Sequence, residues 1–314
     1  MSFWKKLPKP FFILAPMANV TDAAFRRVIA QHGKPDVMYT EFVSANGLAS
    51  AGRAGLLPDL KYSESERPII AQLFTAEPDK LFEAARLVQE LGFDGIDINM
   101  GCPDKNVMKQ GAGASLMKKP ELARELMRAA KAGAPTLPLS VKTRIGDTKN
   151  TLKEWLPVLL AEEPASIIVH ARTRKEMSKV PARWETIAEA VDIAKGSDTL
   201  IIGNGDVLTL EDGRAKAAAT GADGIMIGRG IFGNPWLFNE TAPSPSVAER
   251  LSVMLEHTKL FMELLGEVKS FHIMRKHYKA YANGFDGAKE LRIKLMATES
   301  VADVEAAVQE FLGK

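Results

Sequence analysis

The sequence contains very little cysteine and no long apolar run, and both absences restrict what the protein can be. Cys102 is the only cysteine among 314 residues, so no internal disulfide can form and a reducing, cytoplasmic location is expected. No stretch approaches the roughly 20 apolar residues of a membrane helix. The apolar run at 11–17 is too short and too rich in proline for a signal-peptide core. No His, Cys and Asp residues recur with metal-ligand spacing, so no metal site is expected.

An excess of charge of one sign is also lacking, because the formal net charge is only +2. The basic residues are nevertheless clustered. Residues 268–294 hold seven Lys and Arg against two acidic residues, and residues 172–183 hold five against one. Such basic patches on a near-neutral protein are typical of a face that docks a polyanion, although a solvated surface explains either patch equally well.

Eight short apolar runs follow one another through the first three quarters of the chain, and helical periodicity separates most of them. The runs are Phe11–Ala15, Asp36–Glu41, Pro68–Phe74, Gly95–Asn99, Leu139–Thr143, Ser166–His170, Leu200–Gly203 and Gly224–Ile227. Amphipathic stretches at 81–91, 122–130 and 187–194 are predicted helices. Eight such units in about 230 residues predict an α/β fold of the (β/α)8 TIM-barrel type. A doubly wound open sheet is the alternative, but no glycine-rich turn follows the first run.

A change of composition near Thr241–Ser246, which is rich in proline and serine, indicates a boundary. Beyond it no strands are predicted. Helices are expected at 247–265, 269–282, 288–296 and 301–311, and they would form a small C-terminal helical bundle. We therefore expect one domain at 1–242 and a second at 247–314.

Polar residues stand at the ends of the predicted strands, where barrel enzymes carry their chemistry. Cys102 follows the fourth strand, and a lone thiol there is a candidate catalytic group. Lys142 would point into the barrel mouth and needs an anionic partner, either a cofactor or a salt bridge to Glu41 or Asp97. The amides of Gln72 and Asn99 suit a ring with alternating N–H and C=O groups. His170, at the end of the sixth strand, is a candidate cofactor contact.

Glycine-rich turns close the last two strands, at Gly203-Asn204-Gly205 and Gly228-Arg229-Gly230. Barrel enzymes often bind phosphate in these two loops. Glycine lets the backbone approach the ligand, and an arginine can donate two hydrogen bonds to phosphate oxygens. The pair of turns predicts a phosphate site.

Together these segments resemble the tRNA-dihydrouridine synthases, which are FMN-dependent barrel enzymes that reduce uridine in tRNA. The resemblance spans nearly the whole chain, in the family's order. The matching motifs are 15–22 (APMANVTD), 72–73 (QL), 99–103 (NMGCP), 141–146 (VKTRIG), 170–174 (HARTR), 203–207 (GNGDV), 228–230 (GRG) and 233–236 (GNPW), with 274–277 (MRKH) and 287–292 (GAKELR) in the tail.

The resemblance implies a role for each matching residue. The flavin ring would be held by the Pro16 and Met17 backbone, Gln72, Lys142 and His170, and its phosphate by Asn204, Gly205, Gly228 and Arg229. Cys102 would be the general acid, and Asn99 would orient the target base. Arg172, Arg275 and Lys276 would contact the RNA. NADPH is the implied electron donor and tRNA the implied partner, with a monomer as the simplest state.

Two other functions are compatible with parts of the sequence. A flavin-dependent reductase of a free pyrimidine would explain the barrel but leave the basic C-terminal helices without a role. A non-catalytic RNA-binding barrel would leave the polar strand ends without a role. The sequence therefore favours a flavin-dependent enzyme that acts on RNA.

Overall fold

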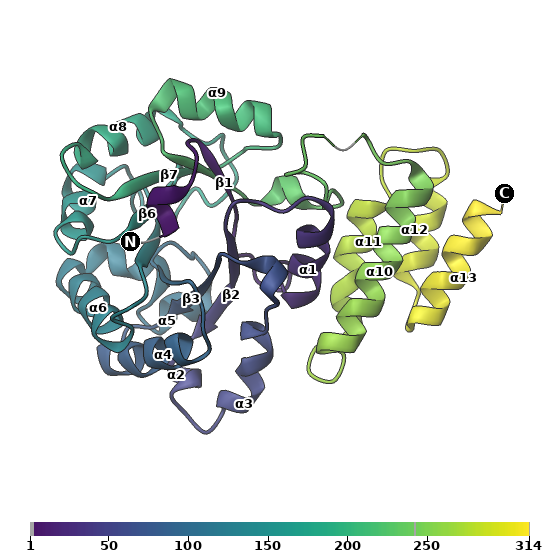
Figure 1. Cartoon of the computed structure of the whole chain (residues 1–314), viewed down its shortest axis with the longest axis horizontal. Helices are drawn as coiled ribbons and strands as arrows, with labels where there is room; N and C mark the ends of the chain where they lie inside the picture. The colour runs from purple at the N-terminus through teal and green to yellow at the C-terminus, as the bar shows by residue number, and fades with distance from the viewer. Residues whose placement is uncertain (1–2, 242, 314) are drawn as a thin grey trace.

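The computed structural model describes residues 3–241 and 243–313, and its first part is a closed barrel of eight parallel strands (Figure 1). The strands are β1 (Phe11–Leu14), β2 (Met38–Ser44), β3 (Ile69–Phe74), β4 (Gly95–Asn99), β5 (Leu139–Arg144), β6 (Ser166–His170), β7 (Leu200–Asn204) and β8 (Gly224–Ile227). From β2 to β8 each strand pairs in parallel with the next, and β8 pairs with β1. A bridge between Ile13 and Val37 closes the ring between β1 and β2. This confirms the predicted TIM barrel and excludes the open sheet.

Helices surround the barrel and then continue alone at the C-terminal end (Figure 1). Those within the barrel sequence are α1 (Ala23–His32), α2 (Ala45–Leu48), α3 (Arg53–Leu56), α4 (Pro78–Glu90), α5 (Lys105–Lys109), α6 (Pro120–Gly133), α7 (Leu152–Leu160), α8 (Glu185–Ala194) and α9 (Leu210–Thr220). Those beyond it are α10 (Val247–Leu265), α11 (Arg275–Tyr281), α12 (Ala288–Met296) and α13 (Val301–Leu312).

Local capping chemistry sets where several of these helices begin. The Asp22 carboxylate accepts the backbone N–H of Phe25 at the start of α1, and Pro78 opens α4 with its fixed φ. Ser246 and Ser300 form capping boxes at the starts of α10 and α13. The first helix beyond the barrel, α10, therefore begins directly after its cap at Ser246.

Apolar side chains fill the inside of the barrel, as the uninterrupted apolar strands predict. Ile13, Ile168 and Ile202 are fully buried there in one cluster. Trp4, on the short 3-10 helix η1 (Phe3–Lys6), is 2% exposed and packs against Phe11 at the N-terminal end of the barrel. Trp4 therefore belongs to the apolar cluster of the barrel interior at this end.

Among the predicted strands and C-terminal helices, two differ from the structure by more than one residue at an end. The second strand runs from Met38 to Ser44 rather than from Asp36 to Glu41, and the Asp36 carboxylate accepts the backbone N–H of Phe12 at 2.7 Å. The helix expected at 269–282 is interrupted: Ser270 caps the 3-10 helix η6 (Phe271–Met274), and α11 begins only at Arg275.

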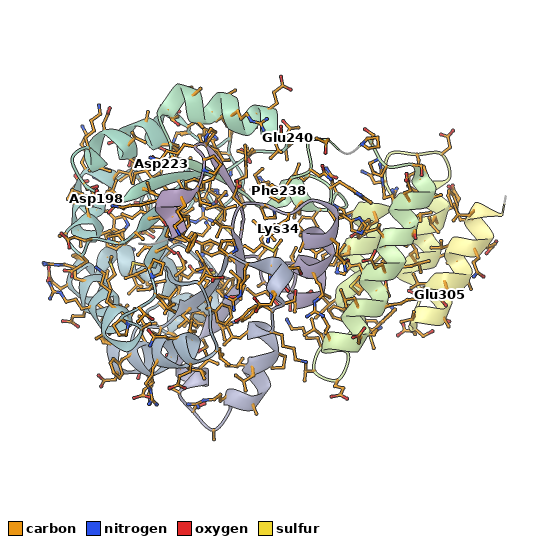
Figure 2. The ribbon with its side chains drawn as sticks, viewed as in Figure 1. Lys34, Asp198, Asp223, Phe238, Glu240 and Glu305 are labelled. Carbon is orange, nitrogen blue, oxygen red and sulfur yellow. The ribbon has the colours of Figure 1, made fainter. Side chains whose placement is uncertain are left out.

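Lys269, just before the interrupted segment, reaches from the bundle to the barrel. Its Nζ lies 2.6 Å from the Glu41 carboxylate and 2.7 Å from that of Asp59. A second connection is helical, since α1 packs along α10 (Figure 1). Within the bundle, Glu305 on α13, labelled in Figure 2, pairs with Lys259 on α10 at 2.5 Å. Among the described residues, no helix is both long and apolar enough to cross a membrane.

Candidate active site

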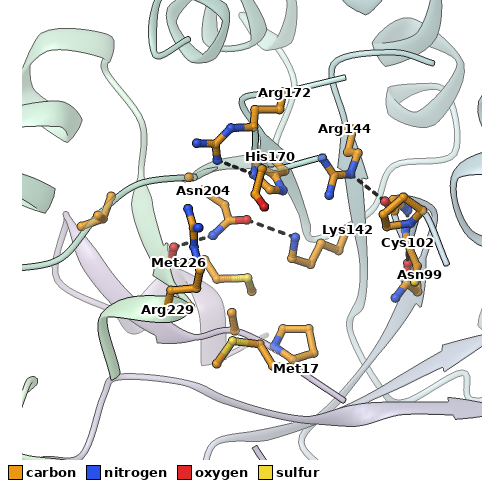
Figure 3. Close-up of a pocket in the computed structure, with 18 of the residues that line it drawn as sticks. Met17, Asn99, Cys102, Lys142, Arg144, His170, Arg172, Asn204, Met226 and Arg229 are labelled. Atoms are coloured by element: carbon orange, nitrogen blue, oxygen red, sulfur yellow. Dashed lines mark hydrogen bonds between the residues drawn. The ribbon is translucent and has the colours of Figure 1, made fainter. Parts of the chain in front are cut away.

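A pocket of about 300 Å³ opens at the carboxyl ends of the barrel strands (Figure 3). It is lined by Cys102, Asn99, Arg172 and all nine residues implied as flavin contacts, namely Pro16, Met17, Gln72, Lys142, His170, Asn204, Gly205, Gly228 and Arg229. Arg275 and Lys276 do not line it. Residues separated by more than 200 positions in the sequence thus meet around a single cavity.

Strand register explains why these residues meet. Asn99 on β4 lies opposite Lys142 on β5, and His170 on β6 lies opposite Asn204 on β7. Because neighbouring strands are parallel, their last residues lie at the same end of the barrel. The side chains at these strand ends therefore point toward one ligand space.

Lys142 is a cation without an acidic partner among the described residues. Its Nζ lies 3.2 Å from Oδ1 of Asn204, whose own amide donates to the Met226 carbonyl at 2.8 Å. Burial, and then the nearby Arg144 guanidinium, lower the pKa of Lys142 to about 8. The alternative salt bridges were wrong, because Glu41 binds Lys269 and Asp97 binds Ser140 and Gln72. The Lys142 ammonium is thus left for an anionic ligand.

His170 lines the pocket from the end of β6. The Arg172 guanidinium lies 3.1 Å from His170 Nε2, and since a guanidinium can only donate, Nε2 accepts and Nδ1 carries the proton. Burial, and then the charges of Lys142 and the surrounding arginines, hold the pKa of His170 well below its ordinary value. The imidazole is therefore neutral and offers an N–H donor.

Asp206, which the sequence did not single out as a site residue, organises both arginines at the phosphate loops. One of its oxygens pairs with Arg172 and the other lies 2.7 Å from Arg229. Arg172 is only 2% exposed and also donates to the Val180 carbonyl, so it lies in the pocket wall rather than on an outer surface. Arg229 stays 59% exposed and can still turn toward a ligand.

The backbone conformation of Gly205 and the space around it both require glycine. Its φ of 131° is disfavoured for other residues, and a Cβ there would lie 2.8 Å from the Cβ of Ala182. At Gly228 a Cβ would meet only Met17 and Ala15, at 3.5 and 3.6 Å, so this glycine leaves space inside the pocket. The two turns therefore form an open cradle beside Arg229.

Cys102 is partly buried. Hydrogen bonds from neighbouring side chains to the backbone hold its loop in place. Its backbone N–H donates to Oδ1 of Asn99 at 2.9 Å, as does that of Gly101 at 3.1 Å. Arg144, a polar residue near the end of the fifth strand for which the sequence predicted no specific role, donates from Nε to the Gly101 carbonyl at 2.8 Å. Burial is the largest effect on the thiol and raises its pKa above the ordinary value. The thiol is therefore protonated at neutral pH.

The two basic residues expected on the C-terminal helices lie away from the pocket and are partly engaged. Arg275 donates to the Glu299 carboxylate at 2.8 Å. Lys276 is half-buried, and this burial lowers its pKa, although Asp22 and Glu41 act in the opposite direction. Lys269, from the same basic segment, holds the bundle to the barrel. Part of the basic segment therefore contacts the barrel of the same chain.

Eight other pocket residues were given no role from the sequence. Four of them, Ala15, Gly101, Pro103 and Val207, lie within the quoted motifs. The other four, Phe42, Ser178, Leu208 and Met226, had no signal of their own. Within 3–241 and 243–313, no group of three or more His, Cys, Asp or Glu side chains is placed to hold a metal ion.

Comparison with known sequences assigns the chain to a family. The profile of the dihydrouridine synthase family, described as "Dihydrouridine synthase (Dus)", matches residues 13–313. The chain belongs to the dihydrouridine synthase family. This confirms the resemblance of the sequence motifs.

Curated members of the family match over their full length. A protein of Bacillus subtilis named "Probable tRNA-dihydrouridine synthase 2" is 41% identical over 315 residues, which is 99% of this chain and 96% of that protein. One of Staphylococcus aureus named "Probable tRNA-dihydrouridine synthase" is 40% identical over 316 residues, 99% of this chain and 95% of that protein. Both the barrel and the C-terminal helices therefore belong to the shared family sequence.

Solved structures of more distant proteins share the fold of this dihydrouridine synthase family member. An old yellow enzyme homologue from Zymomonas mobilis aligns with a TM-score of 0.52 and 16% identity, covering 78% of this chain and 94% of that one. Histamine dehydrogenase from a Rhizobium species aligns with a TM-score of 0.54 and 13% identity, covering 79% and 48%. At these identities the likeness supports the barrel fold alone.

Proposed function

We propose that the chain reduces specific uridines of tRNA to 5,6-dihydrouridine, with FMN as its bound cofactor and NADPH as electron donor. The observation that carries the proposal is the meeting of Cys102, Lys142 and Arg229 around one pocket. A proton donor, a cation without an acidic partner and a glycine-lined phosphate cradle are the groups that such a reduction requires.

The residues present fit a flavin mononucleotide. Lys142 supplies the positive charge that its ring needs on the pyrimidine side, and His170 supplies an N–H donor. Gln72 and the backbone of Pro16 and Met17 complete the ring contacts. The phosphate would be held by Asn204, Gly205, Gly228 and Arg229, where glycine leaves space and the guanidinium can fork onto phosphate oxygens.

In the proposed reduction, the cofactor supplies a hydride and the thiol supplies a proton. When bound and reduced, FMN supplies the hydride that adds to C6 of the uracil ring. Cys102 donates its proton to C5, for which its raised pKa is favourable because the thiol then still holds the proton at neutral pH. Asn99 donates one amide N–H to Gln72 Oε1 at 3.1 Å and would orient the target base with the other.

The substrate must present its uridine outside the base stack, since the pocket lies within the barrel mouth. We propose that residues 1–242 form the FMN-binding catalytic barrel and that 247–314 form the tRNA-binding domain. Arg275 and Lys276 would contact the RNA backbone from the bundle, and Arg172 from the pocket wall. A cytoplasmic location and a monomeric state stay predictions.

A cysteine variant tests the reaction directly. Cys102→Ala should retain bound FMN and NADPH oxidation but lose uridine reduction by at least 100-fold, the usual scale of a general acid. The measurement is dihydrouridine content of tRNA by mass spectrometry after incubation with each protein. Full activity of Cys102→Ala would refute the acid role.

The cofactor and the substrate class are tested separately. Purified protein should be yellow, and failure to take up FMN would remove every flavin-dependent function. Reduction of free uracil or uridine at a rate equal to that of tRNA would favour the small-molecule reductase. Mass spectrometry of tRNA from cells lacking the gene should reveal the missing dihydrouridine.

A further inference from the structure

A β-bulge in β2 directs Glu41 away from the barrel interior. The pairing of β2 with β3 shifts between Tyr39 and Phe42, so Thr40 and Glu41 together oppose one residue of β3. Tyr39 faces inward, and in a regular strand Glu41, two residues later, would share that face. The bulge gives the inward face to Phe42, which lines the pocket, and leaves Glu41 facing the helical bundle.

The Glu41 carboxylate joins the bundle to the turn that follows β1. Its Oε2 accepts from Lys269 Nζ at 2.6 Å, and its Oε1 accepts the backbone N–H of Asn19. The side chain of Glu41 is 6% exposed and that of Lys269 is 13% exposed, so the pair is largely removed from water. One carboxylate thus holds a cation of the bundle with one oxygen and the barrel turn with the other.

This turn, residues 16–20, forms one wall of the pocket, since Pro16 and Met17 line it (Figure 3). A Cβ at Gly228 would lie 3.5 Å from the Met17 sulfur, so Met17 also borders the expected phosphate cradle. Inside the turn, the Met17 N–H donates to the Thr21 hydroxyl at 2.9 Å, and the Met17 carbonyl accepts the Thr21 N–H. These bonds close the turn but do not fasten its tip to the rest of the barrel.

Asn19, at the tip of the turn, supplies that connection. Among the described residues, its N–H bond to Glu41 is the hydrogen bond that ties residues 16–20 to any residue outside 15–21. The φ of Asn19, 54°, lies in the left-handed region, which residues other than glycine rarely adopt and which persists where the surroundings hold it. Val20 anchors the far end of the turn in the core, so Glu41 holds the tip and the two pocket residues before it.

We propose that Glu41 is a positioning residue of the cofactor site: Lys269 keeps its carboxylate in the junction, and the carboxylate holds Asn19 so that the turn lines the pocket. A buried carboxylate that loses its cation is strongly disfavoured and turns toward water, which would release Asn19. The bundle thus helps to shape the pocket, apart from any contact with RNA. The consequence for cofactor binding rests on the proposed function with FMN, whereas the consequence for the Asn19 amide does not.

Two double variants of the full chain isolate the hydrogen bond. Lys269→Met combined with Glu41→Gln, and Lys269→Met combined with Glu41→Leu, both remove the whole ion pair, so neither leaves a buried unpaired charge at position 41. Glutamine still offers one carbonyl oxygen, and without the competing ammonium that oxygen is available to Asn19. Leucine offers no acceptor. The two proteins therefore differ in the acceptor for Asn19 and share the loss of the link to the bundle.

Binding of FMN to the cofactor-free proteins, followed by the quenching of its fluorescence, is the first readout. Lys269→Met alone should bind FMN about tenfold more weakly than wild type, which is the scale of one well-made hydrogen bond. Adding Glu41→Gln should restore the affinity to within threefold, and adding Glu41→Leu should not. Lys61→Met is the matched control, because Lys61 also donates across the junction, to the Leu264 carbonyl at 3.0 Å, without reaching the turn. It should bind FMN as wild type does.

Hydrogen exchange of the Asn19 amide is the second readout, and it needs no cofactor. The amide should be protected in wild type and in the glutamine double variant, and should exchange at least tenfold faster in the leucine double variant. If wild type bound no FMN, the proposed cofactor would fall while this exchange still decided the role of Glu41.

The results that overturn the proposal are specific. Equal exchange of the Asn19 amide in the two double variants overturns it in either case. Where wild type binds FMN, equal affinity of the two double variants also overturns it, and so does wild-type affinity in Lys269→Met. If Lys269→Met did not fold, the two double variants, which carry no unpaired charge at position 41, would decide.

Discussion

Acidification should loosen the junction between the barrel and the helical bundle, because two uncharged histidines are buried there. His257 on α10 and His277 on α11 are both fully buried, with ring centroids 4.6 Å apart. Phe25, on the barrel helix α1, stacks on His257 and meets His277 edge-on, each at 4.8 Å. The Tyr281 hydroxyl lies 3.5 Å from His257 Nδ1, while His257 Nε2 and both nitrogens of His277 have no partner within the described chain.

The buried surroundings of the two histidines determine that stability falls as the pH falls. Burial lowers the pKa of His257 to about 3, and burial, then the neighbouring His257 and Lys276, hold the pKa of His277 well below its ordinary value. In the unfolded chain both titrate near the ordinary value of about 6.5. Stability is therefore complete above about pH 6.5 and is lost as the pH falls from there toward 3, because only the unfolded chain binds the protons.

The size of the effect can be worked out from this linkage. Between pH 7.5 and 5.0, protonation of the unfolded state removes about 2 kcal/mol for each histidine. Both together remove about 4 kcal/mol, which is a large part of the 5–15 kcal/mol that typically holds a protein folded.

The assay is urea unfolding of wild type and of His277→Phe at both pH values. Phenylalanine keeps an aromatic ring in the cluster and binds no proton, so the loss of stability between the two pH values should shrink by about 2 kcal/mol. Phe25→Leu is the control, because it weakens the same packing without changing the number of protons bound. It should lower stability equally at both pH values. An unchanged pH dependence in His277→Phe would refute the reasoning.

Three further substitutions test individual contacts. Lys142→Met should stabilise the FMN-free protein to urea, since it removes a cation without an acidic partner, but weaken FMN binding at least tenfold by fluorescence titration. Lys269→Met should lower the free energy of unfolding by about 3 kcal/mol, because it leaves Glu41 without its cation; an unchanged urea midpoint would contradict this. Gly205→Ala should abolish measurable FMN binding at protein concentrations where wild type is saturated, because its Cβ would overlap Ala182.

The places of the pocket residues along the strands could be predicted from the sequence, because they depend on the local pattern of apolar residues. The period and length of the apolar runs determined eight strands, and parallel strands bring their carboxyl ends together. The residues at or near these ends, such as Asn99, Lys142 and His170, therefore lie around one pocket as expected. Membership of the dihydrouridine synthase family was likewise readable from motifs in order.

Pairing between side chains was not predictable, because it depends on distances that no local pattern encodes. No pattern predicted that Arg172, a proposed RNA contact, pairs with Asp206, 34 positions away in the sequence. Lys269 was counted in a basic surface but reaches Glu41, 228 positions away. Charge counts along a sequence treat every lysine and arginine as free. The structure shows which of them the fold itself neutralises.

The basic side chains around the pocket explain why the empty pocket should favour binding of an anion. The charges of Lys142, Arg144, Arg172 and Arg229 all act in the same direction on His170. Asp206 offsets part of this charge at the two outer arginines, but Lys142 has no such partner among the described residues. Leaving a cation partly buried and unpaired costs stability in the empty protein. A phosphate-bearing ligand that supplies negative charge recovers this cost, and by mass action its binding stabilises the folded state. The structure therefore couples the stability of the barrel to the same charge that selects its cofactor, so FMN should raise the unfolding temperature of wild type by more than that of Lys142→Met.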